Sequence, residues 1–216
     1  MPSSQLVTLT DPRSPMAEAF RTLRTNLMFS SMDHPLATLL VTSAAPEEGK
    51  STTLANLAVT LAQGGRQTIL VDCDLRRPRQ HEIFGLPAEP GLSNAILDKV
   101  DEPKLLQTPV EGLSLLPAGA VPPNPADLLG SRRMEAIIAN LKSRADFVLF
   151  DAPPVLAVTD AALLASKLDG VLLVVRAGHT QRDHALQAKN LLEKIHVRLV
   201  GTVLTDAAVD RRQTAY

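Results

Sequence analysis

The chain has 216 residues, of which 45% are apolar and 21% are charged, and its formal net charge is −1. This length is enough to bury a substantial core, and the composition is ordinary for a soluble globular protein. The near-neutral charge and the lack of any run of Lys or Arg argue against a nucleic-acid binder.

The location of the protein is indicated by what the sequence lacks. Cys73 has no second cysteine to pair with, which favours a reducing compartment. The opening MPSSQLVTLTDPRSP has no apolar core of a signal peptide, and no apolar run approaches the roughly 20 residues that span a bilayer. We therefore expect a cytoplasmic chain that reaches a membrane only through a partner.

The sequence pattern of the N-terminal third predicts two strands and two helices. Residues 1–13 are polar with two prolines and are expected to form a flexible arm. From Ser14 the apolar residues follow helical spacing. The run ATLLVTS (37–43) predicts a strand, TTLANLAVTLAQ a helix that Gly64-Gly65 ends, and QTILVDCD (67–74) a second buried strand.

The rest of the chain is first irregular and then strongly patterned. Residues 80–130 are expected to hold a short helix (91–98), one or two strands (112–119) and a loop (121–129). Beyond them we expect helices at 132–143, 160–168 and 181–195, and strands at 146–154, 170–178 and 198–205. Apolar strands that alternate with amphipathic helices predict an α/β fold, with a mostly parallel central sheet and helices on both faces. Residues 14–206 are expected to form one domain, and 207–216 a flexible tail.

The first strand runs into a stretch typical of a phosphate-binding loop, SAAPEEGKST (43–52). Backbone N–H groups and the start of the next helix could surround phosphate oxygens there, with Lys50 reaching the terminal phosphates and the Ser51 hydroxyl binding Mg²⁺. Ala44 stands where the usual pattern has its first glycine. The alternative is a tight turn with an exposed lysine, but the strand, loop and helix together favour nucleotide binding.

Acidic residues follow two further predicted strands. Asp72 and Asp74 end the strand at 67–74, and Asp151 ends the strand at 146–154. Ligands of open α/β sheets bind at the carboxyl ends of the strands, and the metal of a nucleotide needs hard oxygen ligands. Each aspartate alone could be a strand-end cap, but together with the loop they predict an ATP site with Mg²⁺.

These motifs resemble those of the BY-kinases, the bacterial tyrosine kinases of capsular and exopolysaccharide synthesis, within the MinD/ParA-like P-loop superfamily. The first motif of that family, S-x-x-P-x-x-G-K-S-T, is matched by residues 43–52. This family motif, like the present chain, has no glycine six positions before the lysine. D-x-D-x-R is matched by Asp72, Asp74 and Arg76, and D-x-P-P by Asp151, Pro153 and Pro154. E-x-x-R-x-x-R of an N-terminal helix is matched by Glu18, Arg21 and Arg24. The similarity runs from about residue 14 to 206.

The resemblance implies a role for each motif. It places the phosphates of ATP on the loop residues Ala45, Pro46, Glu47, Glu48, Gly49, Lys50, Ser51 and Thr52. It places Mg²⁺ on Ser51, Asp72 and Asp151, and the catalytic groups are Lys50, Asp72, Asp74 and Asp151. Either Asp72 or Asp74 would accept the proton of the tyrosine. Arg76 would orient an acid or the acceptor, or form a surface salt bridge. Thr205 and Asp206 are candidates for the base pocket.

The resemblance also implies partners. Glu18, Arg21 and Arg24 would contact a neighbouring subunit in a ring, although such a charged helix face is often only solvated. A membrane-embedded polysaccharide co-polymerase would activate the kinase and hold it at the inner face of the plasma membrane, and a tyrosine phosphatase would oppose it. The family usually ends in several tyrosines, whereas this chain has only Tyr216. Tyr216 is a minimal acceptor, the tail is truncated, or the acceptor is another protein; a tail residue without a role is the plain alternative.

Three functions remain open on the sequence alone. The first is an ATP-dependent protein-tyrosine (auto)kinase. The second is a MinD/ParA-like ATPase switch, but that class places a lysine five residues before the loop lysine, where this chain has Ala45. The third is a nucleotide-binding scaffold of the polysaccharide machinery without kinase output, which the single tyrosine favours and the intact acidic motifs oppose.

Overall fold

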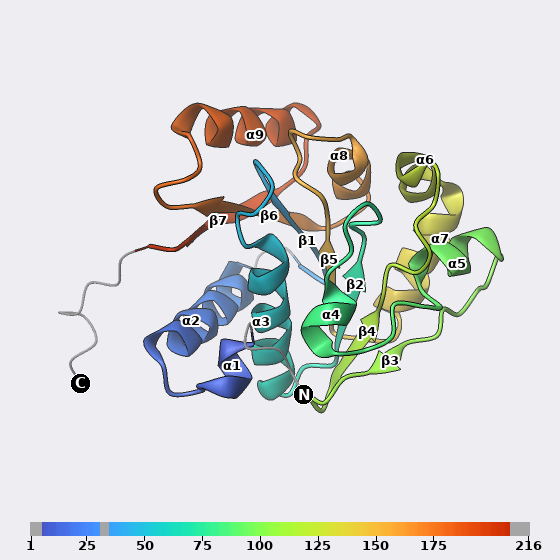
Figure 1. The fold of residues 1–216 in the computed structure, drawn as a ribbon, viewed down its shortest axis with the longest axis horizontal. Coiled ribbons are helices and arrows are strands. Elements are labelled where there is room, and N and C mark those ends of the chain that lie inside the picture. The colour runs from blue at the N-terminus through green and yellow to red at the C-terminus, as the bar shows by residue number, and fades with distance from the viewer. Residues whose placement is uncertain (1–5, 31–34, 208–216) are drawn as a thin grey trace.

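The fold is built on a seven-stranded sheet (Figure 1). The computed structural model of the chain describes residues 6–30 and 35–207. The strands are β1 (Thr38–Ser43), β2 (Thr68–Asp72), β3 (Leu106–Gln107), β4 (Leu113–Leu116), β5 (Phe147–Asp151), β6 (Gly170–Arg176) and β7 (Leu199–Thr205). They lie in the order β3-β4-β2-β5-β1-β6-β7, and each neighbouring pair is parallel except β3–β4. The predicted mostly parallel α/β sheet is confirmed.

Helices pack on both faces of this sheet. They are α1 (Val7–Thr10), α2 (Pro15–Ser30), α3 (Lys50–Gln63), α4 (Gln80–Phe84), α5 (Leu92–Leu97), α6 (Pro125–Gly130), α7 (Arg132–Lys142), α8 (Asp160–Ala165) and α9 (Arg182–Lys194). Apolar side chains of α2, α3 and α4 form the core on one face, and those of α5 to α9 form the core on the other. Among the described residues, no helix combines the length and the apolar character needed to cross a bilayer.

Strand β1 shows why the central strands are apolar at nearly every position. Leu39 and Val41 belong to the core under α3, while Leu40 belongs to the core under α7. Successive side chains of a strand point to opposite faces, so a strand covered on both sides buries all of them. All six residues of β1 are buried.

The register of the sheet brings three of the motifs to one edge. Asp72, the last residue of β2, pairs directly with Asp151, the last residue of β5. Asp151 also pairs with Val41 near the end of β1, immediately before the phosphate loop. Because these strands are parallel, their carboxyl ends meet at the same edge, as the sequence predicts.

The predicted flexible arm at 1–13 is wrong for the part that the structure describes. Leu6 is fully buried, and residues 7–10 form α1. The backbone N–H and the hydroxyl of Thr8 both donate to Asn56 Oδ1 on α3, at 3.1 and 2.9 Å. Polar composition hid this contact, because a single buried leucine and one hydrogen-bonding threonine are enough to dock so short a segment.

Residues 80–130 also differ in detail from the sequence-based expectation. The helix predicted at 91–98 is α5, and β4 lies inside the predicted strand segment. The segment predicted as a loop at 121–129 ends in α6, which begins at Pro125 directly after Asn124. Asn before a proline at the first helical position is a known start signal. The helix α4 and the two-residue β3 are too short to show a period in the sequence.

We expect Thr8→Val to lower the free energy of unfolding by about 1 kcal/mol, because it removes one buried hydrogen bond and leaves the Thr8 N–H on Asn56. Urea denaturation measures this. Thr10→Val is the matched control, since the Thr10 hydroxyl bonds only to Leu6 within the same segment and the residue is exposed. Equal effects of the two variants would contradict the proposed docking of α1.

Candidate active site

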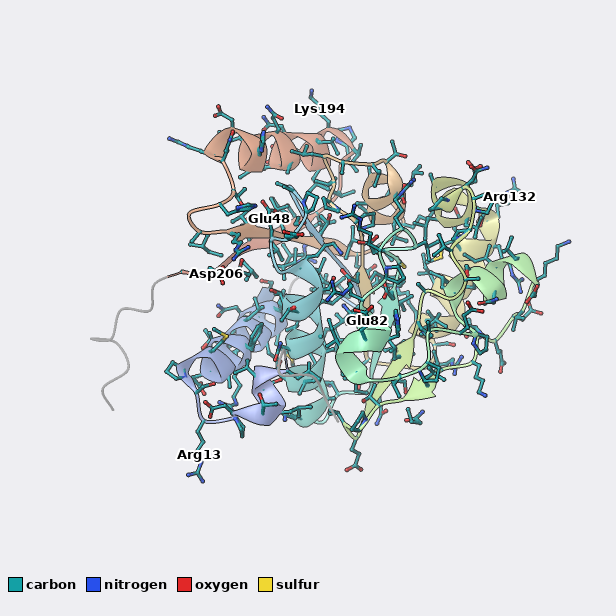
Figure 2. All side chains as sticks on the ribbon, in the orientation of Figure 1. Arg13, Glu48, Glu82, Arg132, Lys194 and Asp206 are labelled. Carbon is teal, nitrogen blue, oxygen red and sulfur yellow. The ribbon has the colours of Figure 1, made fainter. Side chains whose placement is uncertain are left out.

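The phosphate loop joins β1 to α3 through a closed turn. Gly49 and Glu47 have positive φ angles of 86° and 63°, so the chain reverses sharply before Lys50. A side chain at Gly49 would be strained in this conformation and would also contact Thr205. The buried Glu48 carboxylate accepts the Ala45 N–H at 3.0 Å across the turn. Figure 2 shows Glu48 inside the molecule.

Ala44 explains why the loop tolerates the missing glycine. Its side chain is 2% exposed and packs in the core on the α7 face of the sheet. Ala44 does not line the cavity beside Lys50. The departure from the usual pattern is accommodated by packing and does not disrupt the turn.

The phosphate loop is hydrogen-bonded to residues of β6 and β7 and of the segment that follows β6. Thr180, after β6, donates its hydroxyl to Glu48 Oε1 at 2.5 Å, and the Thr205 hydroxyl donates to the Glu48 carbonyl at 2.8 Å. Arg176 donates to the Glu47 carbonyl at 3.2 Å and to Asp206 at 2.6 Å. Thr205 and Asp206, predicted for the base pocket, therefore support the loop in this structure, and nothing in these contacts tests a role toward the base.

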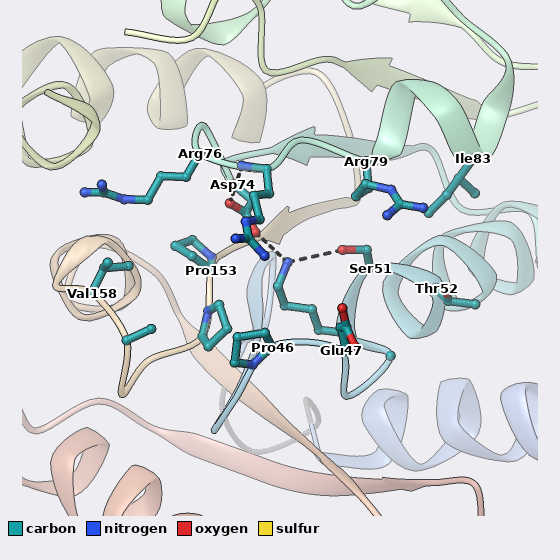
Figure 3. A pocket seen from close by; sticks show the side chains of 15 residues that line it. Pro46, Glu47, Ser51, Thr52, Asp74, Arg76, Arg79, Ile83, Pro153 and Val158 are labelled. Atoms are coloured by element: carbon teal, nitrogen blue, oxygen red, sulfur yellow. Dashed lines mark hydrogen bonds and ion pairs between the residues drawn. The ribbon is translucent and has the colours of Figure 1, made fainter. Parts of the chain in front are cut away.

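Lys50 lies between two of the predicted acids, Asp74 and Asp151. Its ammonium is 2.9 Å from Asp74 Oδ2, 3.2 Å from Asp151 Oδ1 and 3.2 Å from Ser51 Oγ. Figure 3 shows Asp74 and Ser51, with dashed lines for their contacts with the lysine. Burial lowers the pKa of Lys50, but the charges of Asp151 and Asp74 more than offset this and raise it above the ordinary value. The lysine is thus a fixed cation at the start of α3.

Asp72 is held differently from the other two acids. Its carboxylate accepts the backbone N–H groups of Asp74, Arg79 and Gln80, at 3.2, 3.0 and 2.9 Å, and so caps the start of α4. Full burial, followed by the charge of Asp151, raises the pKa of Asp72 to about 8, although the Gln80 N–H and Lys50 act in the opposite direction. Asp72 is therefore mostly protonated at pH 7 when no cation is bound.

The acids and hydroxyl present here suit a hard divalent cation. Two buried carboxylates, those of Asp74 and Asp151, contact one lysine, which leaves an excess of negative charge beside the Ser51 hydroxyl. Within residues 6–30 and 35–207, however, no three acidic, His or Cys side chains are already arranged around a vacant metal position. Mg²⁺ usually takes one or two carboxylates together with phosphate oxygens and water, so such a cation would arrive with the nucleotide.

A cavity of about 430 Å³ opens beside Lys50. Its polar lining includes Lys50, Ser51 and Asp74 together with three arginines of the loop after β2, and its apolar lining comes from Ile83 and the segment after β5. The arginines are Arg76, Arg77 and Arg79, and the apolar segment contributes Pro153, Pro154, Ala157 and Val158. Asp72 and Asp151 do not line the cavity.

The two walls of the cavity are tied together by an ion pair that the sequence did not indicate. Arg76 Nε and Nη2 donate to the two oxygens of Asp160, the first residue of α8, at 2.9 and 3.0 Å. Asp160 is fully buried, while the Arg76 side chain is 42% exposed. Arg76 is therefore paired with an acid on another element and does not orient Asp72 or Asp74 in this structure. In the sequence, Asp160 looks like an ordinary acid at a helix start.

The predicted intersubunit residues lie on α2, away from the loop. Glu18 and Arg21 form an ion pair of 2.6 Å, and Arg21 also donates to the carbonyl of Pro12. Arg24 Nη1 donates to the Thr60 carbonyl near the end of α3 at 2.8 Å. These are contacts within one chain, and they do not test the oligomer. Tyr216 lies outside the described residues.

With this geometry in view, the likeness to known proteins becomes specific. A family model described as an AAA domain matches residues 47–199. The tyrosine-protein kinase YwqD of Bacillus subtilis is 40% identical over 200 residues, which make up 92% of this chain and 84% of that protein. This chain belongs to the bacterial tyrosine-protein kinase family. The family resemblance seen in the sequence motifs is confirmed.

Two further relatives extend the comparison. The tyrosine-protein kinase Wzc of Salmonella typhimurium is 35% identical over 214 residues, which are 99% of this chain and 30% of that longer protein. The solved kinase domain of the Escherichia coli tyrosine kinase ETK has 32% identity and a TM-score of 0.90, covering 98% of this chain and 83% of that domain's chain.

The wider fold is shared with P-loop ATPases. The cell division ATPase MinD of Pyrococcus furiosus has 24% identity and a TM-score of 0.67, over 82% of this chain and 75% of that one. At this identity the likeness shows the fold alone. The predicted P-loop NTPase fold is confirmed. A MinD of Pyrococcus horikoshii that shares this fold was solved in complex with Mg-ADP.

The excess charge at the site predicts a pH-dependent effect of Asp151→Asn on the stability of nucleotide-free protein in EDTA. Below about pH 4, Asp72 is protonated in both the folded and the unfolded protein. Between about pH 4 and 8 the raised pKa of Asp72 makes the folded protein bind more protons, so folding stability is lost as the pH rises. Removing the charge of Asp151 reduces this loss.

We therefore expect Asp151→Asn to gain stability relative to the parent protein as the pH rises through this range, as measured by urea unfolding at each pH. Asp183→Asn on the exposed start of α9 is the control and should show no such trend. A constant difference between Asp151→Asn and the parent protein would contradict the interpretation.

Proposed function

We propose that this chain is an ATP-dependent protein-tyrosine kinase, of the non-specific protein-tyrosine kinase type, that phosphorylates itself and regulates capsular or exopolysaccharide synthesis. The observation that carries the proposal is the position of Lys50, held between Asp74 and Asp151 at the start of α3, in a chain 40% identical to a named tyrosine-protein kinase. A phosphoryl-transfer site needs a fixed cation and acids at this position.

ATP is proposed to bind with its phosphates over Ala45–Thr52, where backbone N–H groups and the N-terminus of α3 favour anions. Lys50 then exchanges its contacts with Asp74 and Asp151 for phosphate oxygens. Mg²⁺, when bound, neutralises charge on the phosphates. The Ser51 hydroxyl and the carboxylate of Asp151 would hold it, and Asp72 would act directly or through water.

We propose Asp74 as the group that accepts the proton of the tyrosine hydroxyl, whose ordinary pKa is about 10. Asp74 lines the cavity that an acceptor would enter, and Lys50 is its ion-pair partner there. Asp72 lies outside the cavity lining and would have to give up three backbone N–H donors, two of them at the start of α4, to reach an acceptor. Its contacts suit a role in holding the metal side of the site.

The ATPase switch is the second candidate. The P-loop fold is common to both classes, and the single tyrosine of the chain is the feature that favours the switch. The residue five positions before the loop lysine is Ala45, so the cation that such switches place there is lacking. For the third candidate, a scaffold, the arrangement of Lys50 and its two acids offers no support, because a binding scaffold has no need of it.

The partners proposed for the kinase follow from its family. In Wzc the stretch similar to this chain is 30% of a longer protein. We propose that this chain works with a membrane-embedded polysaccharide co-polymerase. This partner would activate the kinase and hold it at the inner face of the plasma membrane. A tyrosine phosphatase would reverse the modification.

The proposal is tested by intact-protein mass after incubation with Mg²⁺-ATP, with and without the cytoplasmic segment of a cognate co-polymerase. We expect a gain of one phosphate on Tyr216, and we expect Lys50→Met to reduce the rate by about 10²–10³-fold because a preorganised charge at the transferring phosphoryl group is lost. Tyr216→Phe separates the acceptor from the catalyst. Release of phosphate to water without any gain in mass would favour the ATPase switch.

We also propose that Glu18, Arg21 and Arg24 on α2 contact a neighbouring subunit in a head-to-tail ring. Arg24 is engaged with α3, so Arg21→Ala is the cleaner test. We expect Arg21→Ala to shift the protein toward the monomer in gel filtration with light scattering. Arg13→Ala, an exposed arginine outside the motif, is the control (Figure 2). An unchanged elution profile of Arg21→Ala would rule out this contact.

A further inference from the structure

Gln80, the first residue of α4, contacts all three sequence motifs of the site. Its backbone N–H donates to Asp72 Oδ2 at 2.9 Å. Its side-chain Nε2 donates to Asp151 Oδ2 at 2.7 Å and to the carbonyl of Ser51 at 3.1 Å. One glutamine therefore links the phosphate loop, the end of β2 and the end of β5.

The contact with Asp151 fixes how that carboxylate is turned. Asp151 has two oxygens: Oδ2 accepts from Gln80, and Oδ1 faces the ammonium of Lys50. Asp151 is fully buried, so solvent offers no substitute donor for Oδ2. Without the amide of Gln80, rotation about the Cβ–Cγ bond of Asp151 would no longer be restrained on that side.

The side-chain amide oxygen of Gln80, Oε1, is in an unusual environment. Gln80 is fully buried, yet its Oε1 has no hydrogen-bond partner among the described residues. A buried acceptor without a partner normally costs free energy, so a native structure tends to supply one from protein, water or ligand. Oε1 shares its amide carbon with Nε2 and so lies close to Asp151. Water molecules around a cation at Asp151 are donors of the right kind.

We propose that Gln80 is a positioning residue for the metal–nucleotide site: it holds Asp151 with Oδ1 toward Lys50, and its free Oε1 accepts from water bound to the cation. The role rests on the proposed function, because it concerns the same ATP site. Gln80 does not line the cavity beside Lys50, so its role is to act through Asp151. Partners that orient ligating carboxylates typically change metal affinity or activity by about 10–100-fold when they are removed.

The test is the gain in ADP affinity that Mg²⁺ provides. The dissociation constant of a fluorescent ADP analogue is measured with Mg²⁺ and with EDTA, and their ratio is compared between the parent protein and Gln80→Leu. Leucine is similar in size but has neither the donor nor the acceptor. We expect the ratio to fall about 10-fold or more. Gln80→Leu also removes the contact with the Ser51 carbonyl of the phosphate loop, but a loss of ADP affinity from that cause affects both conditions and cancels in the ratio.

Two further variants keep the test decisive. Gln80→Asn keeps a polar amide but is one methylene shorter, so it should fold and still lose the contact with Asp151; we expect the same fall. Gln63→Leu makes the same substitution at an exposed glutamine at the end of α3 and should leave the ratio unchanged. A purely structural role of Gln80 would lower the unfolding midpoint without changing the ratio.

The outcomes separate this inference from the proposed function. An unchanged ratio in both Gln80 variants, next to a clear Mg²⁺-dependent gain in the parent protein, would overturn the role of Gln80 and leave the kinase assignment intact. A parent protein whose ADP affinity does not respond to Mg²⁺ would overturn the metal–nucleotide site and, with it, this role.

Discussion

The ammonium group of Lys50 lies among three acids that are almost completely buried. Asp74 and Asp151 contact it directly, and Asp72, whose pKa is raised, lies in register beside Asp151 on the neighbouring strand. Burying unpaired charges is costly, so without this cation the carboxyl ends of β2 and β5 could not carry acids side by side. Burial, followed by the charge of Asp151, raises the pKa of Asp72.

The support of the phosphate loop is divided between two parts of the molecule. On one side, the Glu48 carboxylate accepts both the Ala45 N–H of the turn and the hydroxyl of Thr180 after β6. The Thr205 hydroxyl at the end of β7 donates to the Glu48 carbonyl. On the other side, α4 is attached to Asp72, Asp151 and Ser51. The loop therefore lies between elements from both halves of the chain, and its conformation is set by polar contacts that are mostly shielded from water. Such contacts are stronger than exposed ones and keep the turn in place before a ligand binds.

The cavity beside the loop combines two kinds of surface. The loop after β2 supplies arginines, and the segment after β5 supplies prolines and small apolar residues. The bidentate pair of Arg76 and Asp160 fixes the distance between these walls. A flat aromatic ring with a hydroxyl could lie on the apolar side while its oxygen approaches Asp74. A tyrosine acceptor of the proposed kinase would fit these two surfaces. The two consecutive prolines after Asp151 restrict the backbone of the apolar wall.

The sequence by itself determined the elements whose signals are local. Apolar runs between helical patterns gave the parallel sheet, and the strand, turn and helix around Lys50 gave the phosphate loop. Acids at strand ends gave the site, because parallel strands necessarily bring their carboxyl ends to one edge. The tertiary structure alone decided which polar side chains meet. Gln80 lies 71 residues from Asp151, Asp160 lies 84 residues from Arg76, and Thr180 lies 132 residues from Glu48. The local sequence of each resembles any helix start or loop. It also decided that Asp72 caps α4 and that Leu6 is buried. Hydrogen bonds between distant segments depend on which strands are neighbours and on sub-ångström placement, and neither leaves a periodic trace in the chain.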